Sequence, residues 1–100
     1  MSQLKVYITP EAYEEIKALP GNARQRVKKI IRDLSKQPRP AQCKLLQYPI
    51  ENRQLYRIRM DNWRIVYAIT ESENALDILA VRRRPPYDYG DLTSLIGELE

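Results

Sequence analysis

Three arginines in two neighbouring segments are the residues of this chain best suited to bind an anion. Arg57 and Arg59 alternate with apolar residues in one segment, and Arg64 follows the Asp61-Asn62 pair in the next. Asp and Asn tolerate the left-handed backbone of a two-residue turn, so the two segments are predicted to form a β-hairpin. Because side chains alternate across a strand, the three arginines should lie on the same face.

A two-residue turn at Asp61-Asn62 would pair Met60 with Trp63, and this pair sets the register of the whole hairpin. Arg59 then faces Arg64, and the face opposite the arginines carries Trp63 and the core side chains Tyr56, Ile58, Ile65 and Tyr67. Like charges directly opposite each other destabilise a sheet, so this fold is expected to use its arginines to hold something anionic. A solvated outer face is the ordinary alternative. Such a face usually carries Lys and Glu, and these two strands have neither on it.

A second group of candidates follows the last predicted strand. Arg82-Arg83-Arg84 closes that strand, and Tyr87 and Tyr89 come directly after two prolines. The chain contains no histidine, so any proton transfer must fall to Tyr, Lys, Asp, Glu or the substrate. The tyrosines have two other uses: their rings can pack on the domain as amphipathic groups, or they can stack on RNA bases.

The elements that must position these groups are indicated by apolar spacing and by helix and turn signals. A first strand is expected over residues 3–9, and Thr9-Pro10-Glu11 then supplies an N-cap, a first-position proline and an early acid for a helix. Pro20-Gly21-Asn22 separates this helix from a second one. Further strands are expected over 55–60, 63–70 and 75–82, and a short helix over 91–99. The predicted order is β-α-α-β-β-β-α.

The second helix carries basic side chains on the surface that its apolar positions leave free. These side chains are Arg24, Arg26, Lys28, Lys29, Arg32 and Lys36. A solvated helix face is the ordinary interpretation, and auxiliary contact with phosphates is the other. We do not expect the primary site here.

Composition limits the function classes further. The chain has 17 Lys and Arg against 13 Asp and Glu, a net charge of +4, which favours a polyanionic partner. We expect one domain over residues 1–100 and a cytoplasmic protein, because neither a membrane span nor a signal peptide is evident. Cys43 is the only cysteine, so an intrachain disulfide is excluded and no metal site is expected.

The order of these motifs resembles the RelE/ParE superfamily of toxins from toxin–antitoxin pairs. The resemblance covers nearly the whole chain and is carried by Lys44-Leu45-Leu46, Tyr56-Arg57-Ile58-Arg59, Trp63-Arg64-Ile65-Val66-Tyr67 and the arginines and tyrosines after the last strand. It implies an α+β fold: a twisted antiparallel sheet with the two-helix hairpin on one face, a basic cleft on the other, and a short C-terminal helix.

The resemblance is closest to the RelE branch, which implies a ribosome-dependent mRNA endoribonuclease. Such a toxin cleaves mRNA in the ribosomal A site and so inhibits translation. In this metal-independent reaction the 2′-hydroxyl attacks the neighbouring phosphate and leaves a 2′,3′-cyclic phosphate, and no cofactor is expected. The implied partners are the ribosome, mRNA and a cognate antitoxin encoded by an adjacent gene, and no membrane.

The family's functional positions map onto this sequence as expectations. Arg57 and Arg59 fall where RelE-type enzymes carry paired basic residues, often lysines, and Arg64 falls on the arginine of the next strand. The arginine after the final strand is best matched by Arg84, with Arg83 one place away, and Arg83 and Lys44 are expected to contact RNA. Tyr87 or Tyr89 takes the place of the late aromatic residue.

Arg57 and Arg59 depart from the family pattern, which often has lysines there, and this departure changes which residue is expected to transfer protons. Guanidinium groups stay protonated, so Arg57 and Arg59 should act as electrostatic clamps. A tyrosine beside arginines then becomes the expected proton handler, because adjacent cations lower a phenol pKa from about 10. Two other functions fit the same fold: a ParE-like toxin that inhibits DNA gyrase without nuclease activity, and an RNA-binding module that only holds phosphates.

Overall fold

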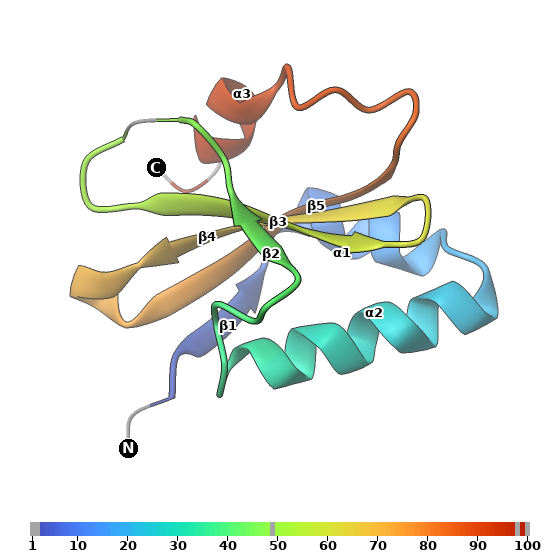
Figure 1. Cartoon of the computed structure of the whole chain (residues 1–100), viewed down its shortest axis with the longest axis horizontal. Coiled ribbons are helices and arrows are strands. Elements are labelled where there is room, and N and C mark those ends of the chain that lie inside the picture. The colour runs from blue at the N-terminus through green and yellow to red at the C-terminus, as the bar shows by residue number, and fades with distance from the viewer. Residues whose placement is uncertain (1–2, 49, 98, 100) are drawn as a thin grey trace.

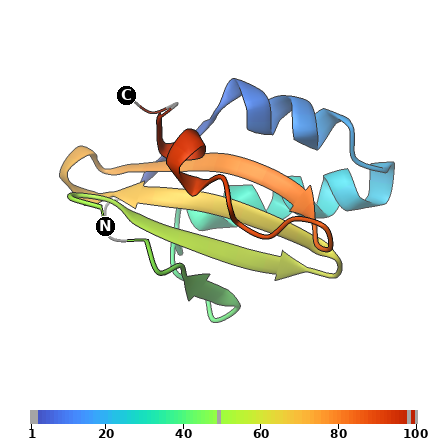
Figure 2. The ribbon, with the colours of Figure 1, turned by 90° about the horizontal axis from the view of Figure 1, so that it is seen from above.

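The computed structural model describes residues 3–48, 50–97 and 99, which form an α+β fold with a central sheet (Figure 1). Helices α1 and α2 lie on one face of the sheet, and α3 lies on the other (Figure 2). No helix among these residues is long and apolar enough to cross a bilayer. The elements are β1 (Lys5–Ile8), α1 (Pro10–Lys17), α2 (Gly21–Leu34), β2 (Cys43–Leu45), β3 (Gln54–Met60), β4 (Trp63–Thr70), the 3-10 turn η1 (Glu71–Glu73), β5 (Ala75–Arg83) and α3 (Leu92–Gly97).

The sheet has the strand order β1-β5-β4-β3-β2. The expectation of an antiparallel sheet is wrong at one edge, because β1 pairs with β5 in parallel and the sheet is mixed. The α1–α2 hairpin separates β1 from the rest of the sheet, and a connection of that length allows a parallel pairing that a tight turn forbids. The approach to the hairpin also forms a short strand, β2, which the expected element order lacked.

The β3–β4 hairpin has the predicted register at every pair. Met60 pairs with Trp63 and Arg59 with Arg64, and the turn residue Asp61 has a φ of 56°. Between β4 and β5 the register shifts at Val66/Tyr67, where a β-bulge interrupts the ladder. Beyond the bulge Arg64 pairs with Arg82, so the row of opposed arginines continues from the hairpin onto β5.

Two apolar layers hold the sheet, one on each face. The first lies under α1 and α2 and contains the predicted core residues of the hairpin, with Trp63 partly buried against it. Within it the rings of Tyr56 and Tyr67 stack with centroids 5.6 Å apart. The second lies under α3, where Leu92, Leu95 and Ile96 cover one end of the face that carries the arginines. The other end of that face is left for polar side chains.

The N-terminal helix begins as its sequence signals predict. The Thr9 Oγ1 atom accepts a hydrogen bond from the Ala12 N–H at 3.2 Å, and Pro10 occupies the start of α1. At the other end of the chain, α3 is shorter than the predicted helix over 91–99, and residue 98 of that prediction lies outside the described residues.

Candidate nucleic-acid interface

Basic side chains from three neighbouring strands gather on the α3 face of the sheet, near the β3–β4 turn. Arg59 and Arg64 form one cross-strand pair, and Lys44 and Arg57 form another on the adjacent strands. Arg57 and Arg64 are half-buried, whereas Arg59 and Lys44 are exposed. The structure therefore brings together four of the residues that the sequence assigned to the site. We call Lys44, Arg57, Arg59 and Arg64 the arginine face.

The charges of the arginine face are not compensated by carboxylates among the described residues. Arg57, Arg59 and Lys44 make no side-chain hydrogen bond or ion pair there. Arg64 is held by the turn, because its Nη1 donates to the carbonyl oxygens of Asp61 at 3.0 Å and Trp63 at 2.9 Å. Its Nε is buried and has no partner in the described part of the chain. Unpaired like charges at this spacing create a positive potential that attracts anions.

Arg82 continues the same row but has a different environment. Its guanidinium contacts three carboxylates: Glu15 at 2.7 Å, Glu11 at 2.9 Å, and Asp91. Burial lowers the pKa of Arg82, but the hydrogen bonds that it donates to Glu15 and Asp91 outweigh burial and raise the pKa above its ordinary value. This arginine is fully engaged in holding the fold. The sequence did not predict this neutralisation, because Glu11 and Glu15 lie about 70 positions before Arg82.

The two arginines after Arg82 remain available at the end of β5. Arg83 pairs in register with Trp63, and the backbone N–H of Arg84 donates to the Asn62 carbonyl oxygen at 2.7 Å. Both side chains are exposed and have no carboxylate partner among the described residues. The Arg84 guanidinium lies 5.1 Å from the ring centre of Tyr89, a cation–π distance. Both arginines therefore lie near the hairpin turn, but the pairing with Trp63 puts Arg83 on the sheet face that α1 and α2 cover, opposite the arginine face.

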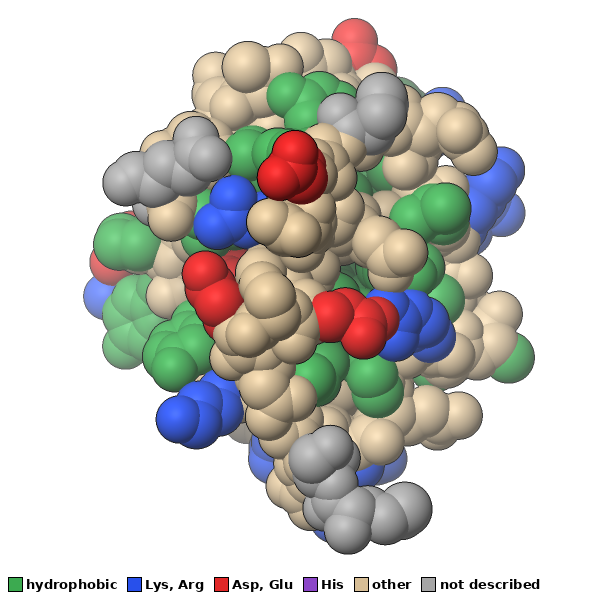
Figure 3. All heavy atoms as spheres, turned by 90° about the vertical axis from the view of Figure 1, so that its left-hand side faces the viewer, with side chains coloured by type: hydrophobic (Ala, Val, Ile, Leu, Met, Phe, Trp, Pro, Cys, Tyr) green, Lys and Arg blue, Asp and Glu red, His purple; other side chains and the backbone are tan. Residues whose placement is uncertain are grey.

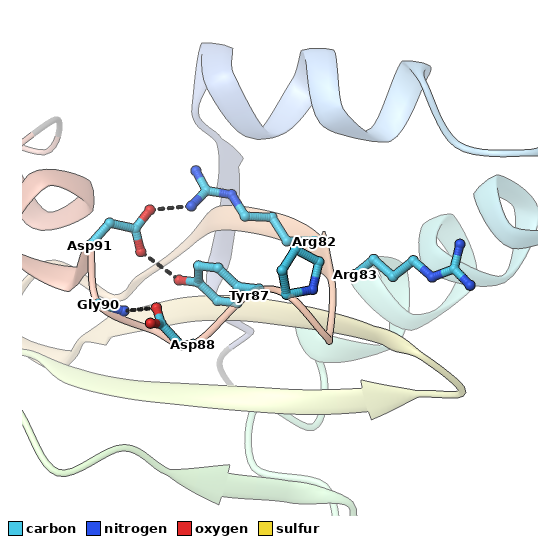
Figure 4. Close-up of a pocket in the computed structure, with 7 residues that line it drawn as sticks. Arg82, Arg83, Tyr87, Asp88, Gly90 and Asp91 are labelled. Atoms are coloured by element: carbon cyan, nitrogen blue, oxygen red, sulfur yellow. Dashed lines mark hydrogen bonds and ion pairs between the residues drawn. The ribbon is translucent and has the colours of Figure 1, made fainter.

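Tyr87 and Tyr89 lie together, in edge-to-face contact with ring centroids 4.9 Å apart. The Tyr87 hydroxyl donates a hydrogen bond to Asp91 Oδ1 at 2.7 Å (Figure 4). Burial and this hydrogen bond raise the pKa of Tyr87 above its ordinary value, and the opposing effect of Arg82 is smaller. The expectation that neighbouring cations lower the phenol pKa is therefore wrong for Tyr87. The Tyr89 hydroxyl is buried and has no partner in the described part of the chain.

A shallow hollow of about 520 Å³ opens where the end of β5 meets the segment before α3 (Figure 4). Its lining combines an arginine and a tyrosine that the sequence assigned to the site with the Arg82–Asp91 pair. The lining residues are Arg82, Arg83, Pro86, Tyr87, Asp88, Gly90 and Asp91. Its size and its mixture of arginine and tyrosine suit part of a nucleotide, with a ring to stack on and cations for a phosphate.

Away from the arginine face, several basic side chains are paired with carboxylates, whereas others on α2, such as the exposed Arg32, have no partner among the described residues. At the end opposite the hairpin turn, acidic and basic side chains are both present (Figure 3), and Arg39 pairs there with Glu71 at 2.6 Å. On α2, Arg26 pairs with Asp61 and Lys29 with Asp33. The described residues contain no cluster of three or more Cys, Asp or Glu that would hold a metal ion.

Comparison with known proteins assigns this architecture to a family. The model of the ParE toxin of type II toxin–antitoxin systems, parDE, matches residues 6–85. No curated protein matches the sequence. Among solved structures, the RelE–RelB complex of Pyrococcus horikoshii OT3 matches with a TM-score of 0.75 at 20% identity, covering 85% of this chain and 99% of that chain.

Two further solved structures show the same fold. The RelBE2 toxin–antitoxin complex of Mycobacterium tuberculosis matches with a TM-score of 0.68 at 24% identity, covering 82% of this chain and 99% of that chain. An arginine-to-alanine double mutant of free E. coli RelE matches with a TM-score of 0.64 at 18% identity, covering 98% of this chain and 94% of that chain. From the family match, supported by these folds, the chain belongs to the ParE toxin family of type II toxin–antitoxin systems, within the RelE/ParE superfamily.

Proposed function

We propose that this toxin is a ribosome-dependent endoribonuclease that inhibits translation by cleaving mRNA in the A site. The observation that carries the proposal is the arginine face: four basic side chains without carboxylate partners in the described chain, next to a hollow lined by arginine and tyrosine. A phosphodiester backbone supplies the anion and its bases supply the stacking partner. The likeness of the fold to RelE structures supports the same assignment.

The proposed reaction uses only groups of the protein and the RNA. The 2′-oxygen attacks the adjacent phosphorus, the bond to the 5′-oxygen breaks, and the products are a 2′,3′-cyclic phosphate and a 5′-hydroxyl. Arg64 and Arg84 hold the scissile phosphate, and Arg57 and Arg59 stabilise the charge that develops on its oxygens. Arg83 and Lys44 contact the flanking backbone. No metal or cofactor takes part in this scheme.

The proton transfers are assigned to the two tyrosines. Tyr87 stays protonated well above neutral pH because its pKa is raised, and its single hydroxyl hydrogen points to Asp91. In the proposed reaction this hydrogen turns from Asp91 Oδ1 to the leaving 5′-oxygen, so that Tyr87 acts there as hydrogen-bond or proton donor. The Tyr89 hydroxyl has no partner among the described residues, and Arg84 lies over its ring. Tyr89 is the remaining candidate for assisting removal of the 2′ proton.

A second candidate function is inhibition of DNA gyrase by binding alone. The match of the ParE family model over residues 6–85 favours it, and so does the absence of histidine and of the lysine pair. The two candidates are separated by translating a defined mRNA in vitro with the purified toxin and mapping the new 3′ ends, beside a gyrase supercoiling assay. Cleavage only on ribosomes supports the nuclease, and loss of supercoiling without cleavage supports the gyrase inhibitor. RNA binding with neither effect identifies a module that only holds phosphates.

We infer that the toxin is neutralised by a cognate antitoxin encoded next to it. The matched structures of Pyrococcus horikoshii and Mycobacterium tuberculosis are complexes with an antitoxin. The arginine face offers such a partner a surface that acidic side chains would neutralise. Ribosomes and gyrase are both cytoplasmic, so the proposed activity places the toxin in the cytoplasm.

A further inference from the structure

A chain of polar contacts runs from α1 through β5 to the segment before α3. Glu15 on α1 binds the end of β5 twice: Oε1 accepts from the Val81 N–H at 2.9 Å, and Oε2 accepts from Arg82 Nε at 2.7 Å. The guanidinium of Arg82 is thereby fixed in orientation, and its side chain is only 21% exposed. Its Nη1 points towards the C-terminal segment and binds Asp91 Oδ2 (Figure 4).

Asp91 joins this chain of contacts to Tyr87. One carboxylate oxygen binds Arg82, and the other accepts the Tyr87 hydroxyl hydrogen at 2.7 Å. The Arg82 guanidinium also lies 5.0 Å from the centre of the Tyr87 ring. The ring and the hydroxyl of Tyr87 are therefore fixed by two different contacts, both of which depend on the Arg82–Asp91 pair.

The placement of Asp91 also matters electrostatically. Burial raises the pKa of Asp91, but hydrogen bonds from Tyr87 and Arg82 outweigh burial, so the pKa lies below its ordinary value and the group is a carboxylate at neutral pH. A carboxylate next to a phenol disfavours the phenolate. The charged groups that face Tyr87 are Arg82 and Asp91, with Tyr89 as a third titratable neighbour.

We propose that Asp91 is a positioning residue, which fixes the ring and the protonated hydroxyl of Tyr87 beside Arg82 at the border of the arginine face. The inference rests on the proposed function in one respect, that Tyr87 serves the cleavage reaction. Among the described residues, the side-chain hydrogen-bond partners of Asp91 are Arg82 and Tyr87, so Asp91 is assigned to act through Tyr87. The neighbouring carboxylate Asp88 makes a different contact: within the part of the chain that the structure describes, its Oδ1 accepts from the Gly90 N–H at 2.9 Å.

The contact between Asp91 and Tyr87 is tested without any nuclease assay, by titrating the tyrosines through their ultraviolet absorbance at alkaline pH. The Tyr87 signal is isolated as the difference between each protein and its Tyr87→Phe counterpart. Asp91→Asn keeps the shape of the side chain but removes the charge, so the pKa of Tyr87 should fall by about one unit. Asp88→Asn is the matched control and should leave the Tyr87 titration unchanged. An unchanged Tyr87 titration in Asp91→Asn overturns the inference, whether or not the wild type cleaves mRNA.

The effect on function is tested by a double-mutant cycle in single-turnover cleavage on programmed ribosomes. Asp91→Asn should slow cleavage about tenfold without weakening mRNA binding, less than the hundredfold expected for removing direct acid–base assistance. In the Tyr87→Phe background the same substitution should have no further effect, because the hydroxyl that it positions is gone. Asp91→Glu should recover part of the rate.

Two outcomes of the cycle contradict a positioning role. An equal loss of rate with and without the Tyr87 hydroxyl assigns Asp91 a purely structural role, as does a loss that follows thermal stability alone. A wild-type protein that cleaves nothing overturns the proposed nuclease function instead, and the alkaline titration then still decides whether Asp91 fixes Tyr87.

Discussion

Arg59 and Arg64 face each other directly across the β3–β4 ladder, and neither has a carboxylate partner among the described residues. Opposed like charges destabilise a strand pair by roughly 0.2–1 kcal/mol. The next arginine in the row, Arg82, shows the alternative, because it is surrounded by three carboxylates. The fold thus neutralises Arg82 on β5 but leaves the unfavourable Arg59–Arg64 pair on the neighbouring hairpin without carboxylates among the described residues. This arrangement is expected when the pair binds an anionic ligand.

The first prediction is that removing one of the two opposed charges stabilises the isolated toxin. Arg59→Gln should raise the free energy of unfolding by up to about 1 kcal/mol, because the repulsion from Arg64 disappears. The same variant should arrest growth less effectively. The matched control is Arg32→Gln, an exposed arginine of α2 without a partner among the described residues, for which chemical denaturation should show little change. A destabilised Arg59→Gln protein would show that the pair is not repulsive in the folded state.

The second prediction concerns the arginines assigned to the scissile phosphate. Arg64→Ala and Arg84→Ala should each relieve growth arrest when the toxin is induced. The two variants should differ in stability, since Arg64 donates two hydrogen bonds to turn carbonyl groups, whereas the Arg84 side chain is exposed. Melting temperatures measured by circular dichroism should therefore fall for Arg64→Ala and stay near wild type for Arg84→Ala. A folded variant that remains fully toxic removes that arginine from the site.

The third prediction separates catalysis by a tyrosine from stacking. Tyr87→Phe and Tyr89→Phe keep the ring but lose the hydroxyl, so at least one of them should slow single-turnover cleavage by roughly a hundredfold or more. Binding of mRNA, measured separately, should stay near wild type. Should both Phe variants cleave normally while the Ala variants bind poorly, the rings serve only as stacking platforms, and catalysis rests on the arginines and the ribosome.

The fourth prediction is that Arg82 is needed for stability. Arg82→Ala leaves Glu11, Glu15 and Asp91 close together without their shared cation, and should lower the free energy of unfolding by about 2–3 kcal/mol. Arg83→Ala, one residue away, is the control, because its exposed side chain has no partner among the described residues and its loss should change stability little. Urea denaturation measures both, and equal effects would contradict the assignment of Arg82 to the fold.

The fifth prediction addresses the antitoxin. If acidic residues of the antitoxin meet the arginine face, the dissociation constant of the complex should rise as the salt concentration is raised. Calorimetric titrations at low and high salt give the dependence, and Arg57→Gln should flatten it. An affinity that is independent of salt would point to an apolar contact, such as the hollow of about 250 Å³ that Ile8, Tyr13, Ile16 and Ile31 help to line, or the surface under α3.

Local patterns in the sequence were sufficient for the hairpin and its arginine face. The alternation of apolar and basic residues has a period of two, and a shift by one residue would bury the arginines, so only one register satisfies both strands. For the same reason Trp63 could be assigned to the core side. The N-cap at Thr9 and the start of α1 at Pro10 could also be predicted locally, since Thr9 and its hydrogen-bond partner Ala12 lie within one helical turn.

The tertiary structure decided the features that depend on contacts between distant segments. The parallel pairing of β1 with β5 joins residues about 70 positions apart, and Arg82 meets Glu11 and Glu15 over similar separations. A run of three arginines therefore looked uniform in the sequence, although the fold neutralises one and exposes two. The pKa of Tyr87 is raised and not lowered as expected, again because of contacts that form only in the folded chain. Its protonation depends more on burial and on Asp91 than on the nearby arginines, and burial exists only once the chain has folded.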